Sequence, residues 1–151
     1  MTAQIWTIGY ERVGAPDFIA ALKKAKIKSL IDVRDVANSR RAGFSKKALA
    51  AALDEAGIVY VHMKPLGTPK AGREAARKGD VKTMQRIFEA RLAEPESQLA
   101  LAEAAEIAKR GRACLMCLEH DWRACHRAMV AARLDAEFGL KPTHLSPELS
   151  I

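Results

Sequence analysis

The sequence predicts an α/β fold: a three-layer sandwich in which helices cover both faces of a mostly parallel sheet. Four short apolar runs alternate with longer segments of helical character, and such alternation implies right-handed crossovers between parallel strands. Three predicted helices are each followed by a glycine, at Gly57, Gly111 and Gly139, where a left-handed cap suits that residue. The chain has 151 residues, which predicts a single domain over residues 1–151.

The predicted strands are the continuous apolar runs at residues 4–9, 29–33, 59–63 and 112–118. Helices are predicted between and after them, at residues 16–24, 45–56, 81–93, 98–110 and 124–138. Pro16 suits a first helical turn and Ser45 suits an N-cap. Residues 64–80 contain two prolines and three glycines, which indicates a long loop with a short helix, and residues 143–145 are predicted as a short fifth strand.

The composition indicates a soluble globular protein, with 49% hydrophobic and 28% charged residues. The first ten residues lack a basic region followed by an apolar stretch, so we expect a cytoplasmic protein without a membrane span. Three cysteines are an odd number in such a chain, and we expect reduced thiols without a disulfide. The net charge of +7 favours anionic partners, although much of it is spread over helix surfaces. The sequence indicates no particular cofactor or oligomeric state.

Unusual polar stretches follow all four of these strands. They occupy residues 9–12, 32–44, 64–70 and 117–127. Because ligands of open parallel sheets bind beyond the carboxyl ends of the strands, we expect the four stretches to form one crevice. We expect its lining to include Gly9, Arg34, Gly67 and Glu119.

The same stretches resemble a known family. The segments "TIGYE", "DVR", "NSR", "GIVYVHMKPLG" and "CLEHDWRACHR" are similar to the family called domain of unknown function 488, over nearly the whole chain. The resemblance implies a fold and a set of motif positions, but no established activity. Those positions are Thr7, Gly9, Asp32, Arg34, Ser39, Gly67, Cys117, Glu119, Cys125, His126 and Arg127. Tyr10 stands where many relatives have histidine, and Asn38 where many have proline, so a mechanism that requires an imidazole at position 10 is not expected.

The three cysteines have different predicted surroundings. Cys114 and Cys117 are three residues apart on a strand and therefore point to opposite faces, which argues against a paired redox or zinc motif and makes Cys114 a core residue. Cys117 and Glu119 share a face. If the last helix begins after Cys125, its thiol lies at a helix N-terminus, where the dipole and Arg127 lower its pKa. On that basis Cys125 is the expected reactive thiol.

Two other chemical interpretations of residues 117–127 remain open. Cys117 and Arg123 have the Cys-x5-Arg spacing of a thiol phosphatase or sulfurtransferase loop, but Glu119 and Asp121 would repel an anion there, and no glycine is present. A metal site is the other interpretation. Its candidate ligands are Cys117, His120, Cys125 and His126, with His62 as an addition. Their spacing differs from the compact pairs of structural zinc sites, so no metal ligand is predicted.

The basic residues admit both structural and binding roles. Asp32 and Arg34 share a face at a strand end and can form a structural ion pair, and Arg127 can pair with Asp32 or Glu119. Alternatively, guanidinium groups suit phosphate or carboxylate ligands. The expected anion-binding rim contains Arg34, Ser39, Arg40 and Arg41.

The leading hypothesis is a thiol-dependent enzyme that acts on a small anionic or nucleotide-like substrate. Its candidate catalytic residues are Cys117, Glu119, Cys125 and His126. Its candidate substrate-binding residues are Gly9, Tyr10, Arg34, Ser39, Gly67 and Arg127. The alternative is a non-catalytic module that binds nucleotide or nucleic acid and has structural cysteines; a metal-dependent enzyme ranks third.

Overall fold

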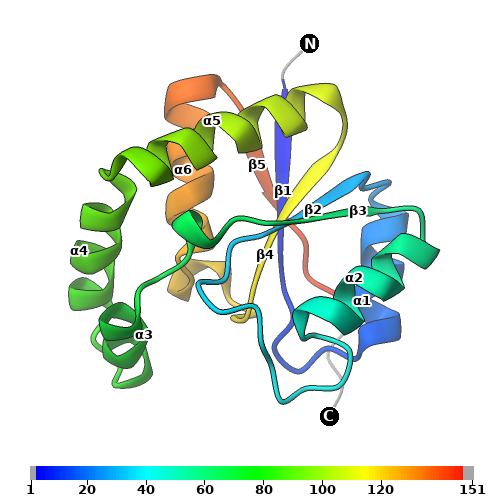
Figure 1. Cartoon of the computed structure of the whole chain (residues 1–151), viewed down its shortest axis with the longest axis horizontal. Helices are drawn as coiled ribbons and strands as arrows, with labels where there is room; N and C mark the ends of the chain where they lie inside the picture. Colours follow the sequence, from blue (N-terminus) through cyan, green and yellow to red (C-terminus); the bar gives the residue numbers. More distant parts are fainter. Residues whose placement is uncertain (1–2, 148–151) are drawn as a thin grey trace.

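The computed structural model describes residues 3–147, which form a fully parallel five-stranded sheet with helices on both faces (Figure 1). The strands are β1 (Gln4–Gly9), β2 (Ser29–Asp32), β3 (Val59–His62), β4 (Ala113–Cys117) and β5 (Lys141–His144), in the order β3-β2-β4-β1-β5. The predicted fold class is confirmed. Pro142 is tolerated in β5 because this strand lies at an edge of the sheet. The predicted domain also includes residues 1–2 and 148–151, which lie outside the described residues.

Within residues 3–147, six α-helices connect or flank the strands. They are α1 (Ala15–Lys24), α2 (Lys46–Glu55), α3 (Lys70–Arg77), α4 (Val81–Leu92), α5 (Pro95–Arg110) and α6 (Arg127–Phe138), with 3-10 turns η1 (Lys64–Leu66) and η2 (Trp122–Ala124). Helix α5 begins three residues before its predicted start, because Pro95 occupies its first turn. Helix α6 begins three residues after its predicted start, because residues 122–124 form the separate turn η2.

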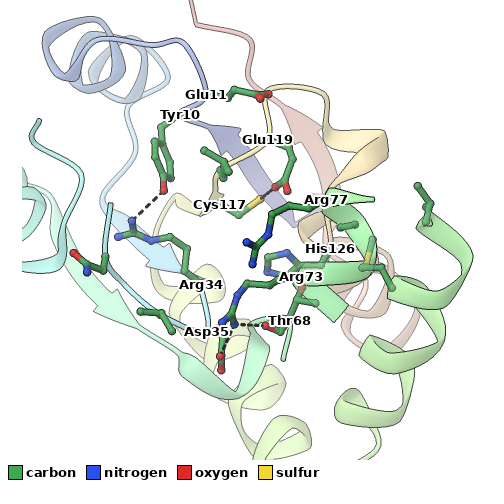
Figure 2. Close-up of a pocket in the computed structure, with 16 residues that line it drawn as sticks. Tyr10, Glu11, Arg34, Asp35, Thr68, Arg73, Arg77, Cys117, Glu119 and His126 are labelled. Atoms are coloured by element: carbon green, nitrogen blue, oxygen red, sulfur yellow. Dashed lines mark hydrogen bonds and ion pairs between the residues drawn. The ribbon is translucent and has the colours of Figure 1, made fainter. Parts of the chain in front are cut away.

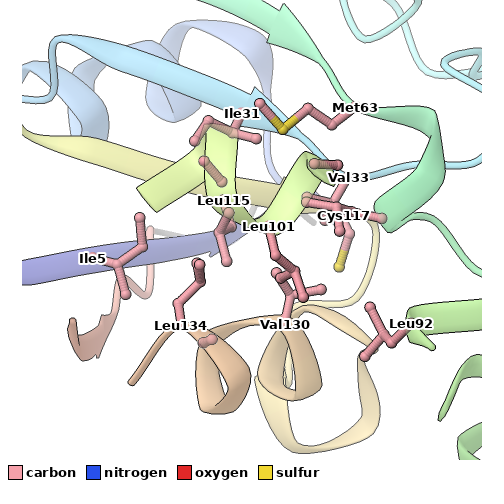
Figure 3. Close-up of a cluster of buried hydrophobic side chains, with 14 of the residues drawn as sticks. Ile5, Ile31, Val33, Met63, Leu92, Leu101, Leu115, Cys117, Val130 and Leu134 are labelled. Atoms are coloured by element: carbon pink, nitrogen blue, oxygen red, sulfur yellow. The ribbon is translucent and has the colours of Figure 1, made fainter. Parts of the chain in front are cut away.

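The helices bury an apolar layer on each face of the sheet. On one face, α1 and α2 supply Phe18, Leu22, Leu49 and Leu53. On the other face, α4, α5 and α6 pack over Ile5, Ile31 and Leu115. Figure 3 shows Cys117 in this second layer, near Val33, Leu101 and Val130. Each large side chain buried in this way contributes roughly 1.5–3 kcal/mol, and both layers hold the strand ends in place.

Helix-end predictions are confirmed at most positions. Gly57 and Gly139 have φ angles of 76° and 69°, as left-handed caps require. Ser45 is the N-cap of α2, and Pro16 lies in the first turn of α1. The prediction for Gly111 is wrong. Its φ of −177° is extended, and as the C-cap of α5 its backbone N–H donates to the carbonyl of Ile107.

The topology creates a crevice at the carboxyl ends of the strands. The chain leaves β1 and β2 toward the helices on one face, and leaves β3 and β4 toward those on the other. Strand β4 lies between β1 and β2 in the sheet. The connection that follows β4 therefore leaves toward one face, while the connections that follow its two neighbours leave toward the other, and a crevice opens between them. Within residues 3–147, no helix combines the length and the apolar character needed to cross a membrane.

Candidate functional site

A cavity of about 480 Å³ opens beyond the carboxyl ends of β1, β2 and β4 (Figure 2). Its wall contains residues from the loops after these strands, from α3 and α4, and from the N-cap of α6. The polar or ionisable members of that wall include Tyr10, Glu11, Arg34, Asp35, Thr68, Arg73, Arg77, Cys117, Glu119 and His126. Five of the predicted site residues therefore line one cavity: Tyr10, Arg34, Cys117, Glu119 and His126.

Gly9 and Gly67 lie beside the cavity and allow the backbone to pack closely. A Cβ atom on Gly9 would collide with the backbone carbonyl of Glu119, and a Cβ atom on Gly67 would collide with the backbone of Asp35. Neither glycine is part of the cavity wall. Their contribution is to bring together the loops that carry its side chains.

The predicted anion-binding rim does not assemble at the cavity. The hydroxyl of Ser39 accepts a hydrogen bond from the backbone N–H of Arg41. The backbone N–H of Ser39 donates to the hydroxyl of Ser45 at 3.1 Å. Arg41 donates to the carbonyl of Val13, and Arg40 is exposed. The hydrogen bonds of Ser39 and Arg41 stabilise the loop before α2, and Ser39, Arg40 and Arg41 are all absent from the cavity wall.

Arg34 forms a buried ion pair with Asp32 at 2.7 Å. Its Nη1 donates to the carbonyl of Phe44 at 2.7 Å and to the hydroxyl of Tyr10 at 3.3 Å. Burial alone would lower the pKa of Arg34, but the hydrogen bonds and charge of Asp32 raise it, so the guanidinium stays charged. Its hydrogen-bonding groups are engaged inside the protein, and Arg34 shapes the wall.

Arg127 is a fully buried cation over the strand ends. Its guanidinium donates to Thr7 Oγ1 at 3.1 Å, to Cys117 Sγ at 3.3 Å and to the carbonyls of Glu119 and His120. The predicted ion pairs with Asp32 or Glu119 do not form among the described residues. Burial lowers its pKa to about 10, which leaves it charged at neutral pH beside Cys117.

Cys117 and Cys125 form a disulfide in this structure, with eight residues of sequence separation. This corrects the expectation of reduced thiols without a disulfide. The end of β4 and the start of α6 meet under the cavity, a proximity that cysteine number and spacing do not reveal. Cys114 is free and buried on the opposite face of β4, where burial raises its pKa, so its predicted core position is confirmed.

His126 is the buried N-cap of α6 and has one free ring nitrogen. Its Nε2 lies 2.7 Å from the carbonyl oxygen of Val33. Because a carbonyl only accepts, Nε2 carries the proton, and the unprotonated Nδ1 lies 3.8 Å from Cys125 Sγ. Burial lowers the pKa of His126 to about 4, so the ring is neutral at pH 7.

Glu119 is the carboxylate nearest the sulfur pair. Its Oε2 lies 3.6 Å from Cys117 Sγ. Burial raises the pKa of Glu119 above that of an exposed glutamate, although the charge of Arg127 opposes this shift. Glu119 is therefore placed to hold or transfer a proton inside the cavity.

Arg73 and Arg77 of α3 are wall residues that were not predicted from the sequence. Arg73 forms an ion pair with Asp35 at 2.6 Å. Arg77 is exposed, has no ion pair among residues 3–147, and extends over the cavity in Figure 2. Their spacing of four residues places both on one helix face, a signal available in the sequence had residues 70–77 been assigned as a helix.

Arg123 does not take the position that a phosphatase-like loop would require. Its side chain is 72% exposed, lies 3.5 Å from Asp121 in an ion pair and is absent from the cavity wall. The Cys-x5-Arg interpretation therefore has no geometric support. His62 is separate from the sulfur pair as well, since its Nε2 donates to the carbonyl of Arg34.

Comparison with known proteins identifies one family. The family model described as Domain of unknown function DUF488 matches residues 15–134, which is most of the chain. No curated protein and no solved structure matches the chain. The comparisons therefore name neither an activity nor a ligand.

Proposed function

Because the chain belongs to the DUF488 family, whose description names no activity, we propose a function from the geometry of the site. The protein is a thiol-dependent enzyme that acts on a small anionic or nucleotide-like molecule bound in the cavity. The observation that carries this proposal is the position of Cys117. Its sulfur lies at the cavity wall, 3.3 Å from the buried guanidinium of Arg127.

The size and lining of the cavity support a ligand of this class. A volume of about 480 Å³ lies within the range of small-molecule sites. Arg77 offers a guanidinium without an ion pair in the described chain, which suits a phosphate or carboxylate group. Val36, Met84 and Leu118 add apolar surface for an uncharged part of the ligand.

The reduced form would be the active form, because both sulfurs of the pair are consumed in the disulfide. In that form, the charge of Arg127 favours the thiolate of Cys117, and Glu119 can supply or accept the proton of the reaction. This assigns the reactive role to Cys117 in place of Cys125. Both cysteines are buried, but only Cys117 lines the cavity.

Ligand binding can be tested by thermal unfolding of the reduced protein with nucleoside monophosphates, nucleoside diphosphates and inorganic phosphate. A ligand at 100 times its Kd stabilises the folded state by ~2.7 kcal/mol. Arg77→Gln should reduce this stabilisation by removing the guanidinium. Lys78→Gln is the matched control, since Lys78 is the next residue in the chain, is exposed and lies outside the cavity wall. Equal stabilisation of both variants would argue against the proposed role of Arg77.

Cys117→Ser separates an enzyme from a binding module. An enzyme should lose turnover of a ligand found in this way while retaining its binding. The disulfide favours the module as second candidate, because it leaves neither Cys117 nor Cys125 free. If the reduced wild type binds the ligand but leaves it chemically unchanged, the binding module is the better account.

A further inference from the structure

Three potential metal ligands converge at the inner wall of the cavity. The sulfur atoms of Cys117 and Cys125 and one ring nitrogen of His126 all lie within 4.8 Å of one another. The three residues come from the end of β4, from the residue after η2 and from the N-cap of α6. Two thiolates and one imidazole, together with a non-protein fourth ligand, are a known coordination set of catalytic zinc.

The orientation of His126 supports ligand function independently of this proximity. Its Nε2–H donates to the carbonyl of Val33 at 2.7 Å, which fixes the ring and leaves Nδ1 as an electron-pair donor beside Cys125. Metal-ligating histidines almost always donate their second ring N–H to a carbonyl, carboxylate or water. The structure therefore contains the supporting hydrogen bond as well as the ligand atoms.

The backbone spacing of the cysteines is also compatible with an ion between their sulfurs. The Cα atoms of Cys117 and Cys125 are 7.5 Å apart, whereas a disulfide usually spans roughly 4.4–6.8 Å. Two sulfurs that each lie about 2.3 Å from a tetrahedral zinc ion are about 3.8 Å from each other. Once the disulfide is reduced, two thiolates that share one ion therefore suit this backbone spacing.

Hydrogen-bond donors surround the sulfurs. Arg127 Nη1 lies 3.3 Å from Cys117 Sγ, and the backbone N–H of Arg127 lies 3.4 Å from Cys125 Sγ. Both donors would stabilise thiolate charge that zinc does not fully neutralise. His120 and His62 do not belong to the cluster within residues 3–147.

We propose that reduced Cys117, Cys125 and His126 bind one Zn²⁺ ion and leave a fourth coordination position toward the cavity. A thiol reductant supplies two electrons and two protons to the Cys117–Cys125 disulfide and is itself oxidised to a disulfide, and binding of Zn²⁺ then releases the two protein thiol protons. This inference deepens the proposed function, because it makes the two thiols metal ligands and places Glu119 beside an open metal position. A catalytic role of the zinc ion rests on the proposed function.

The test uses the full chain, reduced with a phosphine, freed of metal by a chelator and handled without oxygen. Titration with Co²⁺ should produce a thiolate-to-cobalt charge-transfer band that saturates at about one ion per chain, and Zn²⁺ should displace it. Cys117→Ser, Cys125→Ser and His126→Gln should each weaken binding at least ~10-fold. Glutamine retains an N–H donor for Val33, so His126→Gln tests the ligand while limiting the disturbance of the fold.

Cys114→Ala is the control, because Cys114 lies on the other sheet face and should leave the band unchanged. Wild-type protein oxidised to the disulfide should give no band, which checks the sulfur ligands without any substitution. Absence of the band in reduced wild type, or its loss in Cys114→Ala, would overturn the zinc site. The two proposals can fail separately. Turnover by reduced protein that gives no cobalt band would overturn only the zinc site, and stoichiometric zinc without ligand binding or turnover would overturn only the proposed function.

Discussion

Gly9 lies directly against the backbone carbonyl of Glu119, with no room for a side chain between them. The same carbonyl accepts a hydrogen bond from Arg127, so the end of β1 and a buried cation hold the loop that follows β4. The position of the Glu119 carboxylate in the cavity depends on this contact.

Substitution of Gly9 by alanine should therefore destabilise the protein. The added methyl group would have to displace the backbone at Glu119, and overpacking of this kind costs typically 1–3 kcal/mol. Urea denaturation measures the effect. Gly111→Ala is the control, because a Cβ atom there meets only the side chain of Lys28, at 3.7 Å, and should change the free energy of unfolding by less than ~0.5 kcal/mol.

Thr7 connects Arg127 to β5. Its Oγ1 accepts from Arg127 Nε at 3.1 Å and lies 2.5 Å from His144 Nδ1. Thr7→Val keeps the shape but leaves the buried Nε without its acceptor, which should cost about 1–3 kcal/mol of stability. The control is Thr143→Val on the neighbouring strand, because Thr143 is exposed and a change within ~0.5 kcal/mol is expected. Equal unfolding midpoints for the two variants would contradict the role of Thr7.

Arg127 should determine the reactivity of Cys117 in the reduced, metal-free protein. Removal of its charge in Arg127→Met should raise the apparent pKa for alkylation of Cys117, because the thiolate loses a cation 3.3 Å away. Iodoacetamide labelling at several pH values, quantified for each cysteine by mass spectrometry, measures this change. Arg123→Met removes an exposed cation as a control and should leave the labelling profile of Cys117 unchanged.

Cys114 provides an internal reference in the same experiment. It is fully buried, and burial raises its pKa, so it should label last in every folded variant. Rapid labelling of Cys114 would indicate unfolding. An unchanged profile of Cys117 in folded Arg127→Met would show that the guanidinium does not control this thiol.

The periodicity of apolar residues was sufficient to predict the helix and sheet layers and to point to the carboxyl ends of the strands, where the cavity lies. The two-residue repeat of a strand correctly separated Cys114 from Cys117, because each belongs to a different apolar layer. The strand ends then placed Arg34 and Glu119 at one cavity. These features depend on local pattern and on the general geometry of parallel sheets.

The polar contacts of the site could not be predicted in the same way. Arg127 binds backbone carbonyls of Glu119 and His120, and carbonyls are present in every residue, so the sequence could not indicate which would be near. Cys117 and Cys125 meet because the chain turns through η2 before α6 begins. Arg77 was missed because the glycines and prolines around α3 made its segment resemble a loop.

Asp35 should make stability depend on pH at the rim of the cavity. Its carboxylate pairs with Arg73 at 2.6 Å, Arg91 at 3.1 Å and Lys64 at 3.3 Å. Partial burial would raise the pKa of Asp35, but hydrogen bonds from Arg73 and Lys64 lower it below the usual value of about 3.9. Between the lowered folded pKa and the unfolded pKa, the unfolded chain binds more protons, so this contribution to stability increases with pH.

Asp35→Asn should therefore reduce the free energy of unfolding at pH 7, and its difference from wild type should shrink as the pH falls below about 4 through the folded pKa of Asp35. Urea denaturation from neutral to acidic pH measures this difference. Asp54→Asn is the control: Asp54 is exposed on α2, has no ion pair in residues 3–147, and should change the free energy of unfolding by less than ~0.5 kcal/mol. If the difference for Asp35→Asn is the same at pH 7 and at the acidic end of the range, the three cations do not act through the ionised carboxylate, and Arg73 must be held beside the cavity by other contacts, such as its hydrogen bond to the carbonyl of Thr68.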